Sequence, residues 1–158
     1  MKPSKGFSLL ELLTTIALMA VLSAIAIPNV ISMMPKYRLG GSAREILTIL
    51  HYSKMAAIKE NSNVVVNFNS GANNCAVFVD DGEGGGTAED GIRNGSERIL
   101  KQYGMPSGVN LLAPTFGSAL SFNNRGFADL ALEGVITVQN SMGDRKVRVL
   151  PSGHCKIL

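Results

Sequence analysis

The chain has 158 residues, of which 46% are hydrophobic, 17% charged and 6% aromatic, so its length suits one ordinary domain rather than a large multidomain enzyme. Seventeen Gly and six Pro exclude a collagen-like or low-complexity chain, and the modest charge argues against intrinsic disorder. The formal net charge is +3, an excess too small to indicate nucleic-acid binding by the chain as a whole.

The first six residues, MKPSKG, are polar and positively charged, and a long apolar run follows them. From Leu12 to Pro35 there are 24 residues without a charged side chain. As a helix this segment is about 36 Å long, which is enough to cross the hydrocarbon core of a bilayer. Lys2 and Lys5 favour a cytoplasmic N-terminus, so we expect the rest of the chain outside the cytoplasm.

Three interpretations of this segment compete: a secretory signal peptide cleaved at Ala24-Ile25-Ala26, a plain membrane anchor, and a helix that crosses the membrane and later packs against copies of itself. Glu11 favours the third, because a carboxylate costs roughly 2.5–3.5 kcal/mol at the bilayer centre and neither a signal nor an anchor has a use for it. The alternative is that Glu11 lies in the headgroup region, where the cost is smaller.

The Gly6–Phe7 bond separates the basic leader from the apolar run. Cleavage there would create a new amino terminus four residues before Glu11. A free α-amine has a pKa of about 7.7–8 and is largely cationic at neutral pH, so the ammonium of one subunit could neutralise Glu11 of its neighbour. Replacing Glu11 alone would then leave a desolvated cation unpaired.

The processing motif of type IV pilin-like proteins is similar to the segment Lys5-Gly6-Phe7-Ser8-Leu9-Leu10-Glu11-Leu12. The resemblance implies that a prepilin peptidase cuts between Gly6 and Phe7, that Phe7 is N-methylated, and that Glu11 is needed for assembly. The implied partners are other pilin or pseudopilin subunits, the peptidase, the membrane and an inner-membrane assembly platform. The position of Pro28 also resembles the helix proline of this family.

Pro28 and Pro35 interrupt the helix pattern, because each removes a backbone donor and clashes with the carbonyl four residues back. The pair Gly40-Gly41 is a further weak point. We therefore predict a kink at Pro28, or a locally melted stretch between about Ile25 and Gly41, with ordinary bends as the alternative.

A helix is predicted to resume after Gly41, with Ser42 as N-cap and Glu45 completing a capping box. Asn61 is the predicted stop, and His51 is expected as a half-exposed helix residue rather than a metal ligand. Apolar residues at spacings of three and four form the face expected to pack on a globular domain: Ala43, Ile46, Leu47, Leu50, Ala57 and Ile58.

From Asn63 the apolar residues recur at every second position, since Val64, Val66 and Phe68 alternate with polar residues such as Asn67 and Asn69. Further strands are expected at 75–79, 98–102, 109–112, 119–122, 135–139, 145–150 and 154–157. Short strands separated by Gly and Asn turns indicate an antiparallel sheet or sandwich. The predicted fold is therefore α+β, with a leader at 1–6, a helix at 7–62 whose segment 7–34 spans the membrane, and a β-rich head at 63–158.

The latter half resembles the FimT/GspH-type subgroup of minor pilins and pseudopilins. The residues that carry this resemblance are Leu120-Ser121-Phe122, Asn124-Arg125-Gly126, Val135-Ile136-Thr137-Val138, Arg145-Lys146-Val147-Arg148-Val149 and Ser152-Gly153.

An acidic, Gly-rich loop runs from residue 80 to residue 97. Its oxygen-bearing side chains suit Ca²⁺, which takes six to eight oxygen ligands, although their spacing does not match an EF-hand. The candidate ligands are Asp80, Asp81, Asp90, Asn94 and Glu97. A solvated, mobile hairpin tip is the alternative, and we favour it. No other metal or cofactor is expected.

The C-terminal region carries a basic cluster that could contact DNA phosphates. Its candidate residues are Arg145, Lys146, Arg148 and Lys156. Some FimT-type minor pilins bind DNA through a Gly-Arg-x-Arg element, to which Gly153-His154-Cys155-Lys156 corresponds here without either arginine. His and Lys cannot make the bidentate phosphate contacts of arginine, so we favour a solvated basic edge strand over a DNA site.

Cys75 and Cys155 lie 80 positions apart, in a part of the chain expected outside the cytoplasm, where disulfides persist. A bridge would stabilise the fold by about 4–5 kcal/mol on the chain-entropy model. We favour a disulfide that ties the last strand to an early hairpin, with two separate thiols as the alternative.

No catalytic constellation occurs in the sequence: the two His have no Ser or Cys partner in register, and there is no Gly-x-Ser-x-Gly motif. We predict a non-enzymatic, single-pass inner-membrane subunit with its head in the periplasm, which later enters a type IV pilus or a pseudopilus. The alternatives are a pseudopilin of type II secretion, a DNA-binding minor pilin for DNA uptake, and a membrane-anchored enzyme or binding module.

Overall fold

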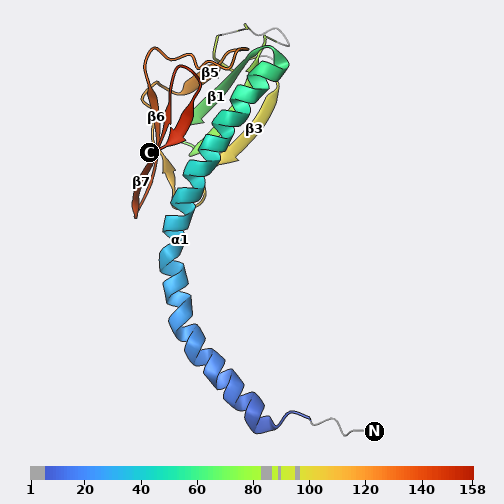
Figure 1. Ribbon diagram of the computed structural model, residues 1–158, viewed down its shortest axis with the longest axis vertical. Helices are drawn as coiled ribbons and strands as arrows, with labels where there is room; N and C mark the ends of the chain where they lie inside the picture. The colour runs from blue at the N-terminus through green and yellow to red at the C-terminus, as the bar shows by residue number, and fades with distance from the viewer. Residues whose placement is uncertain (1–5, 83–86, 89, 95–96) are drawn as a thin grey trace. The chain divides into compact units, whose positions relative to one another are not determined.

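The computed structural model describes residues 6–82, 87–88, 90–94 and 97–158 (Figure 1). The first five residues of the predicted leader lie outside this range. The chain divides into two units, Met1–Met34 and Pro35–Leu158. The second unit contains the whole buried core, so it is the part of the chain that folds on its own contacts.

One helix, α1 (Leu9–Glu60), supplies residues to both units. Every residue in this range is helical, so the predicted melted stretch is absent, while a kink at Pro28 stays a prediction. The predicted N-cap is wrong, because Ser42 is a buried mid-helix residue whose Oγ donates to the Arg38 carbonyl at 2.9 Å. A capping-box pattern inside a continuous helix has no free backbone donors to satisfy.

The predicted stop at Asn61 is confirmed. Asn61 has a φ of 53°, in the left-handed region that Asn tolerates better than most residues. The amide of Ser62 donates to the carbonyl of Ala57 at 3.3 Å, which is the six-to-one bond of a Schellman motif. This cap turns the chain directly into the first strand.

One antiparallel sheet has the strand order β3-β2-β1-β5. Its strands are β1 (Asn63–Asn69), β2 (Asn74–Asp80), β3 (Ile99–Gly104) and β5 (Ala119–Phe122). In its central register Val66 lies opposite Val77 on one side and Leu120 on the other. Figure 1 shows α1 running alongside β1 and β3.

A second antiparallel sheet has the order β4-β6-β7-β8. Its strands are β4 (Asn110–Leu111), β6 (Gly134–Asn140), β7 (Gly143–Val149) and β8 (Cys155–Ile157). All eight strands lie within two residues of the predicted ranges. The alternating pattern was informative because side chains on the core face of each sheet recur at every second position.

The core lies between α1 and the two sheets. Val64, Val66 and Phe68 are buried as predicted, and Val65, on the opposite face of β1, is buried too. The core residues of α1 are Leu39, Ala43, Ile46, Ile49, Leu50, Ala56 and Ala57. Ile58 was predicted in this face but is 51% exposed, because the buried stripe passes through Ala57 at that turn. His51 is exposed, as expected of a residue outside the stripe.

Candidate functional site

The predicted cleavage site lies immediately before α1. Gly6, Phe7 and Ser8 are not helical, and the first intrahelical bond runs from the Leu12 amide to the Ser8 carbonyl at 3.1 Å. Phe7 is 80% exposed. The Gly6–Phe7 bond is therefore in a non-helical, accessible backbone, which is the form in which a peptidase can bind and cut it. Cleavage itself stays a prediction.

Glu11 occupies the first turn of α1 and is exposed. The N-terminus of a helix carries partial positive charge, so a carboxylate in the first turn is favourable. Within the residues that the structure describes, no cation lies within salt-bridge distance of it. The Glu11 carbonyl accepts a hydrogen bond from Thr14 Oγ1 at 3.0 Å, and Thr15 Oγ1 bonds the Leu12 carbonyl at 2.8 Å. These hydroxyls are thus satisfied within the helix, as an apolar environment requires.

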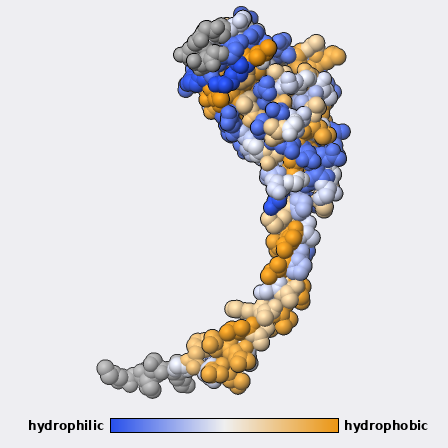
Figure 2. Space-filling model, turned by 180° about the vertical axis from the view of Figure 1, so that it is seen from behind, coloured by the Kyte–Doolittle hydropathy of each residue, from blue (hydrophilic) through white to orange (hydrophobic). Residues whose placement is uncertain are grey.

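The apolar side chains that follow Glu11 are exposed. The N-terminal part of α1 is long and apolar enough to cross a membrane and is not buried, which makes the helix a candidate membrane span. Figure 2 shows these side chains as orange atoms on the N-terminal part of the chain. The large exposed residues include Leu12, Leu13, Ile16, Leu18, Met19, Val21, Leu22, Ile25 and Ile27. Such a surface requires either lipid or neighbouring helices.

The two carboxylates at the ends of the acidic loop are buried. Asp80 and Glu97 are each 1% exposed. Glu97 accepts hydrogen bonds from the amides of Gly82 at 3.3 Å and Asn94 at 2.9 Å, and Asp80 accepts from the Gly91 amide at 2.8 Å. Backbone donors offset the cost of burying these charges, so both carboxylates stabilise the conformation of the loop.

The described candidates for calcium ligands bond to backbone amides and to one another. Asp90 bonds the Ile92 amide and the Asn94 side chain, each at 2.8 Å. Across the described residues no group of three or more His, Cys, Asp or Glu side chains could hold a metal ion. Asp81 is exposed beside this network. Calcium binding stays a prediction.

The predicted DNA-contact residues do not form one patch. Lys146 and Arg148 face outward from β7 while Val147 and Val149 are buried, as expected of a strand. Arg148 donates to Glu133 at 3.2 Å, and Lys146 is 3.5 Å from Asp144. Lys156 lies opposite Arg148 across β7 and β8.

Arg145 lies elsewhere, because its position on β7 alternates with those of Lys146 and Arg148. It lines a hollow with Gly40 and Arg44 of α1. Two of the four predicted cations are therefore neutralised by carboxylates and a third projects to a different face. DNA binding stays a prediction that no contact among the described residues of the head supports.

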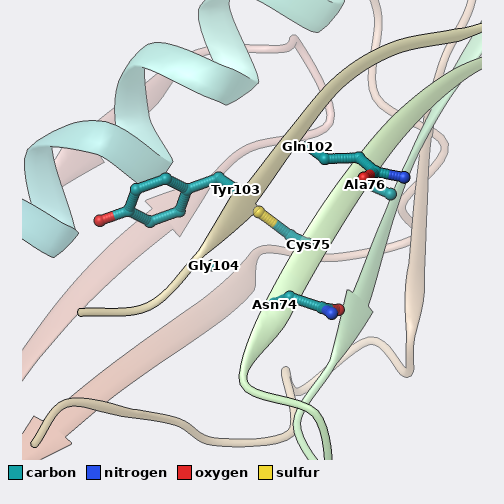
Figure 3. Close-up of a pocket in the computed structure, with 6 residues that line it drawn as sticks. All are labelled: Asn74, Cys75, Ala76, Gln102, Tyr103 and Gly104. Atoms are coloured by element: carbon teal, nitrogen blue, oxygen red, sulfur yellow. The ribbon is translucent and has the colours of Figure 1, made fainter. Parts of the chain in front are cut away.

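The predicted disulfide is absent: Cys75 and Cys155 are free, buried thiols on different sheets. Cys75 lines a cavity of about 260 Å³ with Tyr103 and Gln102 (Figure 3). Burial, together with the nearby Glu45, raises the pKa of the Cys75 thiol to about 11, and the positive charge of Lys101 opposes this rise.

Burial also raises the pKa of the Cys155 thiol to about 11, against the opposing charge of Lys54. Glu45, beside Cys75, and Lys54, beside Cys155, are nine positions apart on α1, which corresponds to about 13.5 Å of helix rise. The bridge fails because each thiol packs at a different level of the core. With such raised pKa values, both behave as small apolar groups rather than nucleophiles.

The sequence matches two family models. The model of type II transport protein GspH matches residues 42–153, and that of the prokaryotic N-terminal methylation motif matches residues 1–27. The chain belongs to the GspH family. No curated protein sequence matches this GspH-family chain.

Solved structures with the same fold come from two kinds of assembly. The type IV minor pilin FimU of Pseudomonas aeruginosa has a TM-score of 0.61 at 13% identity, over 78% of this chain and 90% of FimU. The minor pseudopilin EpsH of the Vibrio cholerae type 2 secretion system has a TM-score of 0.56 at 14% identity, over 77% of this chain and 96% of EpsH. At these identities the structures establish the pilin-like fold.

The family, the methylation motif and the fold together make this GspH-family chain a minor pilin or pseudopilin, of a type IV pilus or a type II secretion system. Its family and its structural neighbours are pilin subunits rather than enzymes. The methylation motif and the apolar helix make it a membrane-anchored pilin.

Sequence reasoning assigned no role to Lys36, Arg38 and Arg44. These cations are exposed on α1 just after the uncharged span. The one sequence feature that could have singled them out is their position, because they are the first charged residues after 24 uncharged ones.

Proposed function

We propose that this chain is a structural subunit that crosses the inner membrane once, with its head in the periplasm. In this proposal a prepilin peptidase cuts between Gly6 and Phe7 and methylates Phe7, and an assembly platform then moves the subunit into a filament. The observation that carries the proposal is the first half of α1, which is wholly unburied and has Glu11 in its first turn.

Assembly in this proposal exchanges lipid for neighbouring helices around the exposed span. Lipid tails are as apolar as the side chains, so burial alone does not set the axial position of one helix against the next. A charged pair between the new amine of Phe7 and Glu11 of an adjacent subunit would set it, because misplacement by one turn leaves both charges unpaired in apolar surroundings.

The mature N-terminus tests the processing step. Mass spectrometry of the protein from its native host should find Phe7 as first residue, with one methyl group on its amine. A first residue near Ile27 would instead identify a secreted protein. An uncut chain in functional filaments would also overturn the proposal.

The Glu11→Ala variant tests the assembly step, with Glu45→Ala as matched control on the same helix. Breaking a buried charged pair costs roughly 3–5 kcal/mol, so Glu11→Ala should lower incorporation into sheared filaments by about 100-fold or more. Glu45 forms a half-exposed pair with Lys101 in the head, so Glu45→Ala should assemble normally. Equal incorporation of the two variants would contradict the proposal.

Two machines use the same assembly physics, and deletion of the chain separates them. Loss of twitching or transformation identifies a type IV pilus. Retention of exoproteins in the periplasm identifies a type II secretion system. A protease added to spheroplasts tests the topology, because a periplasmic head is cut from outside the cell and a cytoplasmic one is not.

A further inference from the structure

The base of the head is tied to the helix residue that follows the span. Asn140, the last residue of β6, donates from Nδ2 to the Pro35 carbonyl at 2.7 Å. One turn further along α1, Arg38 donates to the Ser107 carbonyl at 3.0 Å. Pro35 is bonded directly to Met34, the last residue of the predicted span. The end of β6 is therefore hydrogen-bonded to the first residue that follows the predicted span.

Four exposed cations surround this base, and we call them the basic collar: Lys36, Arg38, Arg44 and Arg145. Arg145, from β7, lines one hollow with Lys36 and another with Arg44, so the two elements contribute to one surface. In the described part of the chain, none of the four forms an ion pair with a carboxylate. The acid at this level, Asp144, is paired with Lys146. Asp144 also lines the hollow with Lys36 and Arg145, so the surface carries about three net positive charges.

An exposed apolar side chain lies among these cations. Met142, at the β6–β7 turn, is 56% exposed and lines a hollow of about 250 Å³ with Lys36 and Leu39. A flexible apolar side chain flanked by cations is the composition of surfaces that lie in the membrane interface.

Two collar residues of α1, Lys36 and Arg38, are at headgroup depth if the span ends at Met34. The headgroup layer is about 5–7 Å thick on each side of the hydrocarbon core, and Lys36 and Arg38 lie within roughly that rise of Met34. Arg44 is about 15 Å along the helix from Met34, which is beyond one Debye length at physiological salt, so its attraction to the membrane surface is weaker than that of Lys36 and Arg38. These charges follow the span, on the side where the positive-inside rule disfavours cations, so the rule does not account for them.

The acidic loop lies at the opposite end of the head from the collar. Asp80 lies across from Asn63 in the β1–β2 register, next to the C-terminal end of α1. The rise of the helix places this end about 37 Å from Pro35. An anionic surface that meets the base is thus not repelled by the acidic loop.

We infer that the basic collar and Met142 form a docking surface for the anionic phospholipid headgroups of the bilayer that the chain crosses. The inference rests on the proposed membrane anchorage. Phosphate groups would lie between the guanidinium and ammonium groups while Met142 enters the interface. The head is then held against the membrane until assembly, and extraction into a filament must break these contacts.

The experiment uses the full chain in vesicles and the absence of tryptophan from its sequence. Met142→Trp places a single fluorophore at the base, and Ser141→Trp does so while keeping the methionine. Ile92→Trp is the matched control, since Ile92 is similarly exposed but lies in the acidic loop. A nitroxide on the lipid headgroup should quench the two basal reporters about twofold or more above the control in vesicles that contain phosphatidylglycerol.

The charge dependence decides whether the contact is with anionic lipid. Quenching of the basal reporters should fall towards the control in phosphatidylcholine alone, and in about 1 M salt, where the Debye length is about 3 Å. It should also fall when Arg44→Gln and Arg145→Gln are combined, but not when Lys59→Gln and Arg125→Gln remove two charges at the other end of the head.

Equal quenching of the Met142→Trp and Ile92→Trp variants, or quenching indifferent to lipid charge, overturns the inference. So does quenching or an emission shift that follows the protein-to-lipid ratio, since that identifies a second copy of the chain as the occupant. Flotation of the unaltered chain with vesicles is measured first. A chain that fails to float contradicts the anchorage itself, which separates failure of the proposed function from failure of the docking surface.

Discussion

The two halves of α1 use similar residues for different purposes. From Leu9 to Met34 the side chains are apolar around the whole circumference and almost all are exposed. From Leu39 to Ala57 the apolar residues form one stripe that is buried against two sheets. Burial within the chain stabilises the second half, whereas the first half depends on lipid or on other subunits.

This difference separates folding from assembly. A substitution in the second half should register in the unfolding of the head, and one in the first half should register in membrane insertion or filament formation. The contrast fails if the head loses stability through changes in the span, or if assembly ignores them.

The largest expected effect comes from matched Leu→Ala changes in the two halves. Leu50 is fully buried, so Leu50→Ala should lower the free energy of unfolding by about 3–5 kcal/mol through lost burial and a residual cavity. Leu18 is 62% exposed, and Leu18→Ala should change it by less than about 0.5 kcal/mol. Urea unfolding of the full chain in detergent, followed by circular dichroism, measures both. Similar losses in the two variants would break the comparison.

Gly153→Ala should lower the free energy of unfolding by about 2–4 kcal/mol, through left-handed strain and overpacking. Gly153 has a φ of 72°, and a Cβ there would lie 2.1 Å from the Gly126 carbonyl oxygen, which is backbone and cannot move aside. Gly71→Ala is the control, since its nearest contact would be an ordinary 3.5 Å. Thermal unfolding of the two variants should differ by several degrees. An unchanged Gly153→Ala would show that the two turns are not packed as closely as the structure has them.

The buried thiols should make the head less stable in alkali. Both pKa values are raised to about 11, so between about pH 9 and pH 11 the unfolded chain loses these protons while the folded chain keeps them. The free energy of unfolding is unaffected below this window and falls within it by up to about 1.4 kcal/mol per pH unit for each thiol.

Denaturant titrations at pH 8, 10 and 11 on the unaltered chain and on Cys75→Ala measure this slope. The variant should lose the share of the slope that belongs to one thiol. Alkylation at pH 8 should reach both thiols only in denaturant. If the unfolded chain can be alkylated only after reduction, Cys75 and Cys155 form a disulfide after all.

The smallest expected effect is at the end of α1. Asn61→Ala should lower the free energy of unfolding by about 1 kcal/mol, because Ala adopts the left-handed conformation less readily than Asn. Asn61→Gly should retain or slightly raise it, since Gly adopts this conformation freely. Thermal midpoints measured side by side test the pair. A lower thermal midpoint in both variants would show that Asn61 stabilises the fold through its side-chain hydrogen bond with Asn124 rather than through its backbone conformation.

Much of the fold was predictable because its signals are local. The eight strands follow from alternation and from turns rich in Gly and Asn, and the helix stop follows from Asn61. The capping box at Ser42 misled because the same two residue types occur inside continuous helices, where the hydroxyl bonds the preceding turn. The motif around Glu11 was predictable because it is a run of contiguous residues.

The sequence by itself determined the uncharged span, the carboxylate at its start and the family. These features depend on residues that are adjacent in the sequence, so the tertiary structure is not needed to identify them. Only the tertiary structure decided that Cys75 and Cys155 pack at different levels, and that Arg145 joins Lys36 and Arg44 rather than Lys146 and Arg148. Those outcomes depend on which distant segments of the chain lie next to each other. Strand register and helix packing determine these neighbours, because a shift of one residue in a strand moves every side chain to the opposite face.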